Sequence, residues 1–225
     1  IGTEQEVPYF ETMWGQPQTT QNMIDLIQAK GFNAIRIPVT WSQHLDEDFQ
    51  ISSLWIARVK EVVDMCILRG LKCMINTHHD HSPYGDGKDW LWADPATVTT
   101  VCAHLETVWT QIANYFKSYS NDLLIFEGYN ELMIKARTWA PPTEAEYTAL
   151  NTIAQTFVDT VRATGGNNST RLLLINTYGC MTTNLQYFQM PTDSAGDGYL
   201  IAGVHIYNDM TNQELETQIT VLDDY

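Results

Sequence analysis

Polar side chains, several of which can carry out acid/base chemistry, recur along the chain, each within or directly after an apolar run. They are Arg36, His78, His79, Asn130, Glu131, Asn176, His205 and Tyr207. A carboxylic acid that directly follows a buried strand loses hydration, which raises its pKa toward the range that a general acid needs. Glu131 follows the run Leu124-Ile125-Phe126 and is therefore the candidate acid.

These positions also have plainer interpretations. An Arg within a strand is often paired with a carboxylate for structural reasons alone, and Asn130-Glu131 could simply begin a loop. The run His78-His79-Asp80-His81 has residue types that suit zinc. Adjacent strand residues point to opposite faces, however, so two neighbouring His side chains would not both point inward. We expect no metal and no other cofactor. His205 and Tyr207 are two residues apart and should share a face.

Aromatic residues give a second signal, since the chain has 7 Trp and 11 Tyr. Several lie in predicted loops, namely Trp14, Trp41, Tyr84, Trp90, Trp92 and Trp139. Core packing explains most Trp side chains, and it is the expectation for Trp55 and Trp109, which lie in predicted helices. Trp41 and Trp139 each come shortly after a predicted strand, so we expect them to be platforms on which the apolar face of a sugar ring stacks.

Hydrophobic periodicity predicts strands that alternate with helices. The strands are 32–39, 71–77, 123–129, 172–177 and 199–207. Two helices are predicted at 19–30 and 97–119, and a third carries Val59 to Cys66 and ends at Arg69-Gly70. A further helix begins at the capping box Thr143-x-x-Glu146 and ends at Gly165-Gly166, and a shorter one is predicted over 213–221.

This alternation predicts parallel βαβ units in one domain over residues 1–225, with apolar strands covered on both faces. No strand is followed by GxGxxG or GxxxxGK, so an open nucleotide-binding sheet has no motif to support it. In a closed (β/α)₈ barrel, the carboxyl ends of the strands meet at one face, where active sites are built. We therefore predict a barrel that collects the polar residues at that face.

The formal charge of −15 argues against nucleic acid and anionic membranes as partners and favours a neutral substrate. No apolar run has the roughly 20 residues that a membrane helix needs. The four cysteines lack CxxC spacing and are expected to be buried thiols.

Six segments together resemble glycoside hydrolase family 5, closest to its bacterial endoglucanases that also act on xyloglucan and mixed-linkage glucans. They are Trp14-Gly15-Gln16-Pro17, 31–41, His78-His79-Asp80, Phe126-Glu127-Gly128-Tyr129-Asn130-Glu131, 158–166 and His205-Ile206-Tyr207. The resemblance implies a TIM barrel, an endo-β-1,4-glucanase activity and a monomer that is secreted, with its signal peptide absent from this sequence. Leu132 departs from the family pattern, which usually has Pro after the catalytic Glu.

The resemblance also implies roles. Glu131 is the acid/base of a retaining mechanism, in which a second carboxylate about 5–5.5 Å away attacks the anomeric carbon. Asn130 contacts the sugar 2-hydroxyl, Arg36 supports the nucleophile, and His78 and His79 are subsite residues. His205 and Tyr207 orient the carboxylates and the substrate, and Asn176 joins the substrate-binding set with Trp41 and Trp139.

The family nucleophile is expected beyond Tyr225, because the chain is expected to cover about strands two to six of the barrel. Glu127 and Asp209 are weaker substitutes. The expectation is a catalytic domain incomplete at both ends, whose five strands alone would be unstable and inactive. The alternatives are a β-mannanase or another β-glycanase of the same clan, and, in a different class, a non-catalytic glucan-binding protein or an inactive fragment.

Overall fold

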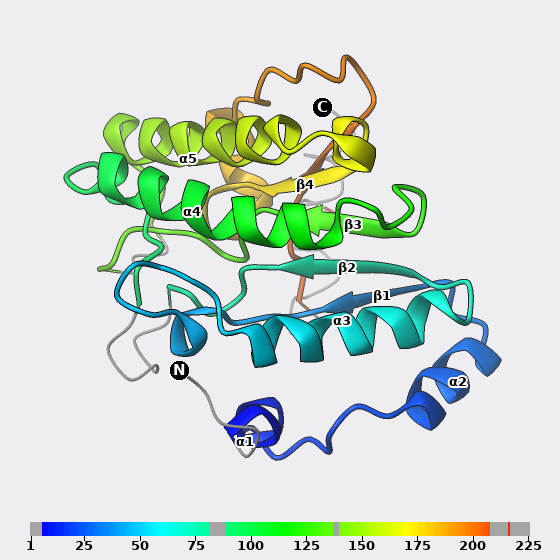
Figure 1. The fold of residues 1–225 in the computed structure, drawn as a ribbon. Coiled ribbons are helices and arrows are strands. Elements are labelled where there is room, and N and C mark those ends of the chain that lie inside the picture. Colours follow the sequence, from blue (N-terminus) through cyan, green and yellow to red (C-terminus); the bar gives the residue numbers. More distant parts are fainter. Residues whose placement is uncertain (1–5, 82–88, 137–139, 208–215, 217–225) are drawn as a thin grey trace.

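A computed structural model describes residues 6–81, 89–136, 140–207 and 216. Their strands form one parallel sheet in the order β1-β2-β3-β4-β5, so each strand pairs with its neighbour in sequence (Figure 1). The strands are β1 (Ala34–Ile37), β2 (Lys72–Asn76), β3 (Leu124–Glu127), β4 (Leu173–Asn176) and β5 (Leu200–Gly203). All five lie within predicted strands, and the parallel arrangement is confirmed.

Helices connect successive strands. The α-helices are α1 (Glu6–Thr12), α2 (Gln21–Ala29), α3 (Ser53–Ile67), α4 (Val98–Phe116) and α5 (Glu144–Ala163). The 3-10 helices are η1 (Ser42–His44), η2 (Gly166–Ser169), η3 (Tyr178–Cys180) and η4 (Thr182–Tyr187). In Figure 1, α3, α4 and α5 lie on the same side of the sheet. Right-handed parallel crossovers place the helices in this way.

Local sequence explains where the elements begin and which face they bury. The capping box at the start of α5 is present, since Thr143 Oγ1 accepts from the Glu146 backbone and the Glu146 carboxylate accepts from the Thr143 backbone N–H. In α4, the apolar face that includes Leu105, Val108 and Ile112 is fully buried. Helix α1 was not predicted, and the predicted helix over 213–221 lies outside the described residues apart from Glu216.

Burial differs between the middle and the edges of the described sheet. Strands β2, β3 and β4 are largely buried, whereas all residues of β1 and β5 are exposed or half-buried. The expectation that every strand is covered on both faces therefore holds for the three central strands only.

Arg171 lies just before β4 and is fully buried. Its guanidinium donates to four backbone carbonyl oxygens, those of Phe116, Tyr119, Ser120 and Leu124, at distances of 2.6–3.3 Å. Three of these carbonyls lie at or just after the end of α4, where carbonyl groups lack helical partners and a positive charge is favoured. Arg171 thus joins the end of α4 to the start of β3, at the edge of the sheet where the strands begin.

The four cysteines are free thiols, and Cys66, Cys73 and Cys180 are buried as predicted. No described helix is long and apolar enough to cross a membrane.

Candidate active site

A cleft of about 650 Å³ lies at the carboxyl ends of the strands. It is lined by Trp14, Arg36, His78, His79, Asn130, Glu131, Val204, His205, Ile206 and Tyr207. Seven of the ten residues proposed from sequence thus share one cavity, although they come from four separate strands or the loops that follow them. In a parallel sheet this juxtaposition follows from topology, because all carboxyl ends meet at the same edge.

Glu131 is the centre of this cleft's hydrogen bonding. Its Oε1 accepts from His205 Nδ1 at 2.8 Å and also from the hydroxyl of Tyr207. A carboxylate can only accept, so Nδ1 of His205 carries the proton. The His205 backbone N–H donates to the carbonyl oxygen of Cys180, which fixes the segment after β5 relative to η3.

The predicted rise in the pKa of Glu131 is wrong. The hydrogen bond from His205 is the largest cause acting on this group, and together with that from Tyr207 it lowers the pKa from 4.5 to about 2 against the opposing effect of burial. Glu131 is therefore a carboxylate at neutral pH. Since the folded pKa lies below the ordinary value, the carboxylate stabilises the folded chain above about pH 4.5, and that contribution is lost as pH falls toward 2.

Removing the His205 side chain should raise the pKa of Glu131, because the strongest hydrogen bond to its charged form disappears while burial remains. His205→Ala should give the larger rise, and Tyr207→Phe a smaller rise in the same direction. The measurement is a ¹³C NMR titration of the labelled Glu131 carboxyl group. Equal titration midpoints in parent and variants would contradict this account.

Arg36 is anchored by a carboxylate that sequence analysis set aside. Its Nε and Nη2 donate to the two oxygens of Glu127, each at 2.6 Å, and Nη2 also donates to Oδ1 of Asn130 at 2.8 Å. The Glu127 side chain is 1% exposed, whereas that of Arg36 is 33% exposed and borders the cleft. Arg36 is therefore paired with a carboxylate, as the plainer interpretation of this residue predicts. Its guanidinium also orients the Asn130 side chain so that the amide oxygen faces Arg36.

His78 and His79 both line the cleft, contrary to the expectation that adjacent residues would face opposite ways. The reason is that β2 ends at Asn76, so strand alternation no longer governs the two histidines. Burial, the first cause, lowers the pKa of His78 to about 3, so this imidazole is neutral. Its Nδ1 lies 3.0 Å from Nδ2 of Asn76. An amide nitrogen only donates, which leaves the His78 proton on Nε2.

Two predicted substrate residues lie beneath the cleft instead of in it. Trp41 is fully buried, with Nε1 donating to the carbonyl oxygen of Asn76 at 2.9 Å and its backbone N–H donating to the Asp80 carboxylate. A buried indole offers no face to a sugar, so the platform expected at Trp41 is absent. Asn176 is also buried, and its Nδ2 donates to Glu127 Oε1 at 2.8 Å and to the carbonyl oxygen of Tyr129 at 2.6 Å.

The carbonyl and amide of Asn176 are closely surrounded. A Cβ at Gly203 on β5 would lie 2.0 Å from Asn176 Oδ1, so only glycine fits at this position. Through its hydrogen bond to Oε1, Asn176 therefore holds the Glu127 carboxylate in place. Trp139, the other predicted platform, and Asp209, the weaker nucleophile candidate, lie outside the described residues.

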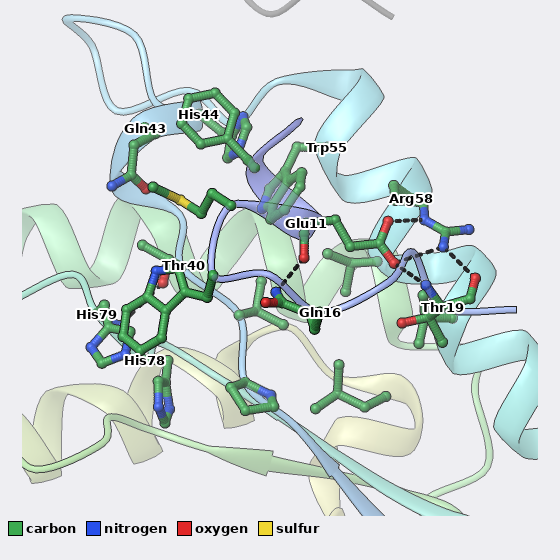
Figure 2. Close-up of a pocket in the computed structure, with 18 residues that line it drawn as sticks. Glu11, Gln16, Thr19, Thr40, Gln43, His44, Trp55, Arg58, His78 and His79 are labelled. Carbon is green, nitrogen blue, oxygen red and sulfur yellow. Dashed lines mark hydrogen bonds and ion pairs between the residues drawn. The ribbon is translucent and has the colours of Figure 1, made fainter. Parts of the chain in front are cut away.

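A second cavity of about 490 Å³ adjoins the cleft and shares Trp14, His78 and His79 with it. It lies between the α1 segment, the end of β1 and α3 (Figure 2). Arg58 and Glu11, both of which line this cavity, form an ion pair at 2.8 Å (Figure 2). Both carboxylate oxygens of Glu11 are engaged by Arg58, so this cavity holds a structural carboxylate and the acid/base chemistry belongs to the cleft.

Two residues of this region were named from the sequence without the part that they play in the structure. Glu127 could have been found, since a carboxylate and a guanidinium in two apolar strands of one sheet are costly unless paired. Trp14 stood among the loop aromatics but was given no role. Among the described residues, no group of three or more His, Cys, Asp or Glu side chains could hold a metal ion.

The sequence matches the family model for cellulase, glycosyl hydrolase family 5, over residues 2–224. The chain belongs to glycosyl hydrolase family 5. The family 5 structures that it resembles have the (β/α)₈ barrel fold, and the five parallel strands described here are part of such a barrel.

Relatives within family 5 include endoglucanase A of Ruminococcus albus, which is 39% identical over 201 residues, 88% of this chain and 52% of that protein. A family 5 enzyme of Prevotella bryantii, solved with a xyloglucan tetradecasaccharide, is 38% identical with a TM-score of 0.89, covering 96% of this chain and 66% of that one.

A xyloglucan-specific endo-β-1,4-glucanase from a metagenomic library, solved with cellotriose, is 35% identical with a TM-score of 0.85, covering 96% of this chain and 67% of that one. The chain spans about half the length of endoglucanase A of Ruminococcus albus.

Proposed function

We propose that this chain is the part of a retaining endo-β-1,4-glucanase that carries the acid/base, Glu131, and that the enzyme hydrolyses cellulose, xyloglucan or mixed-linkage β-glucan. The observation that carries the proposal is the cleft in which Glu131, Asn130 and Arg36 lie with His78, His79, His205 and Tyr207. A polymeric glucan is found outside the cell, so the proposed enzyme is secreted. We also propose that it is a monomer.

In the proposed mechanism, Glu131 protonates the glycosidic oxygen and later removes a proton from the attacking water. The hydrogen-bonded carboxylate of Glu131 suits the second half of that cycle. The first half requires a protonated Glu131, so substrate binding has to rearrange the bonds from His205 and Tyr207. Hydrogen bonds of catalytic groups commonly reorganise when substrate binds.

A retaining mechanism also needs a second carboxylate about 5–5.5 Å from the first. Among the described residues that line the cleft, Glu131 is the sole carboxylate. Glu127 is nearby but its two oxygens are occupied by Arg36. The nucleophile in this proposal is a Glu beyond Tyr225, as the family resemblance implies.

The names of the relatives support the substrate class, since endoglucanases recur among them and two solved relatives contain a xyloglucan oligosaccharide or cellotriose. The test is release of reducing sugar by the full-length protein from cellulose, xyloglucan, lichenan and mannan. We expect activity on the three glucans, and the first-formed product should be the β-anomer by ¹H NMR. Activity on mannan alone would contradict the proposed glucanase and favour the alternative, a β-mannanase.

A further inference from the structure

The turn that follows β4 has an uncommon backbone conformation. Gly179 and Cys180, both in η3, have positive φ angles of 60° and 57°. Glycine adopts this left-handed region freely, but Cys180 is one of two residues other than glycine that have a positive φ in the part of the chain that the structure describes. A residue stays in so sparsely populated a region when its surroundings determine it, and such residues cluster at functional sites.

Hydrogen bonds close this turn and attach it to the sheet. The Cys180 N–H donates to the carbonyl oxygen of Thr177 at 2.8 Å, and the Thr177 hydroxyl donates to the carbonyl oxygen of Met181 at 2.9 Å. The N–H of Thr177 donates to the carbonyl oxygen of Gly203 in β5 at 3.1 Å. Thr177 and Cys180 are both fully buried. These bonds fix the direction in which the Cys180 carbonyl points.

The same turn contacts the segment that carries Glu131. The Gly179 N–H donates to the carbonyl oxygen of Leu132, the residue directly after Glu131, at 2.9 Å. The Ile134 backbone N–H donates to the hydroxyl of Tyr178 at 3.1 Å, and Tyr178 is buried. Two hydrogen bonds thus tie the loop after β3 to the turn after β4.

On its other side, the turn contacts the segment that carries His205. The Cys180 carbonyl oxygen accepts from the His205 backbone N–H at 2.7 Å, and Nδ1 of His205 donates to Oε1 of Glu131 at 2.8 Å. The side chains of Glu131 and His205 are 22% and 26% exposed, so burial alone does not hold them together. The turn joins both partners of this hydrogen bond, one through Leu132 and the other directly.

The Cys180 thiol lies close enough to Glu131, Glu127 and Arg36 for their charges to act on it. Burial, the largest cause, and the two carboxylates raise the pKa of the thiol well above its ordinary value, so the thiol is neutral. A neutral thiol adds no charge beside the acid/base. The influence of Cys180 on the Glu131–His205 pair therefore comes through its backbone carbonyl.

We propose that Cys180 is a positioning residue for the acid/base: its carbonyl oxygen, aimed by the left-handed turn, holds His205 where Nδ1 donates to Glu131. This inference rests on the proposed function, since it concerns the same carboxylate. It assigns the geometry of the pair to a turn that does not line the cleft. Cys180 itself takes no part in proton transfer.

The test compares variants of the full-length protein by ¹³C NMR titration of the labelled Glu131 carboxyl group. Cys180→Val should raise the titration midpoint by about one pH unit or more, because a β-branched residue disfavours positive φ and the carbonyl then moves away from His205. Cys180→Gly should keep the parental midpoint, since glycine preserves the turn without the thiol. Cys73→Val is the matched control, because it makes the same change at a buried thiol of β2 that does not line the cleft.

A milder variant keeps the test decisive if Cys180→Val does not fold. Thr177→Val keeps the shape of the side chain but removes the hydroxyl that closes the turn on Met181. It should raise the Glu131 midpoint in the same direction by a smaller amount. Its control is Thr160→Val, which removes a hydroxyl that donates to the Thr156 carbonyl oxygen within α5, away from the cleft.

A pH–rate profile separates positioning from folding. When the pKa of Glu131 rises, the protonated acid persists to higher pH, so the limb on which kcat/KM falls with rising pH should move upward in Cys180→Val. A merely structural role would lower activity or the melting temperature without moving that limb.

The outcomes distinguish this inference from the proposed function. If Cys180→Val and Thr177→Val titrate like their controls while Glu131→Gln loses activity, the positioning role is wrong and the proposed function stands. If both variants raise the midpoint but the parent hydrolyses no glucan, the turn controls Glu131 as inferred and the proposed function is wrong.

Discussion

Glu131→Gln should lower kcat on polymeric glucan by about 10²- to 10⁴-fold in the full-length enzyme, the usual contribution of general acid/base catalysis. The glutamine side chain keeps the shape of the cleft but cannot deliver a proton to the leaving oxygen. Because poor leaving groups depend most on that proton, the loss should be largest for cellulose and smallest for aryl glycosides with acidic leaving groups. Initial-rate measurements on both substrate types check this.

Glu106→Gln is the matched control, since Glu106 is an exposed residue of α4 that does not line the cleft. It should hydrolyse glucan at the parental rate. A thermal melt should show that both variants remain folded. Hydrolysis of polymeric glucan by Glu131→Gln at the parental rate would remove Glu131 from the mechanism.

Arg36→Met should lower the free energy of unfolding by about 3 kcal/mol, because it leaves the Glu127 carboxylate buried without its counter-ion. Glu127 is 1% exposed and would keep only the amide of Asn176 as a donor among the bonds described here. Removing one partner of a buried ion pair usually costs about 3–5 kcal/mol. We expect the low end of that range, because Arg36 is partly exposed and solvent screens its pair with Glu127 in part. Urea unfolding monitored by circular dichroism gives the measurement.

Arg69→Met is the control for this experiment. Arg69 also pairs with a carboxylate, Asp25, at 2.6 Å, but both side chains are more than a third exposed and solvent screens the pair, so its loss should destabilise the chain far less than the loss of Arg36. The double variant Arg36→Met/Glu127→Leu should recover stability, because no charge then remains buried. If Arg36→Met and Arg69→Met unfold at the same urea concentration, the buried pair has no special role.

The sequence was sufficient to predict the strands, most helices and the set of polar residues at the strand ends. Apolar periodicity determined the elements, and parallel pairing then brought Arg36, Asn130 and His205 to one edge without further information. These predictions succeeded because each depends on spacing within a few residues or on the common direction of all strands.

Contacts between distant residues could not be predicted in this way. The pKa of Glu131 depends on where the His205 ring points, which no local pattern specifies. Trp41 follows a strand just as a platform residue would, but the Asp80 carboxylate and the Asn76 carbonyl hold it inward. The carboxylate paired with Arg36 is Glu127, 91 positions away, and no local spacing indicates that pair. The expected support of a nucleophile by Arg36 stays a prediction.

Arg171 has a consequence for how this protein can be altered. Its four carbonyl partners lie where the strands begin, whereas Glu131 and Trp14 lie in the cleft where the strands end. The group that ties helix to sheet and the groups that line the cleft thus lie at opposite ends of the strands. Changes to the loops of the cleft should therefore leave the Arg171 tether intact, so the strands should keep their register.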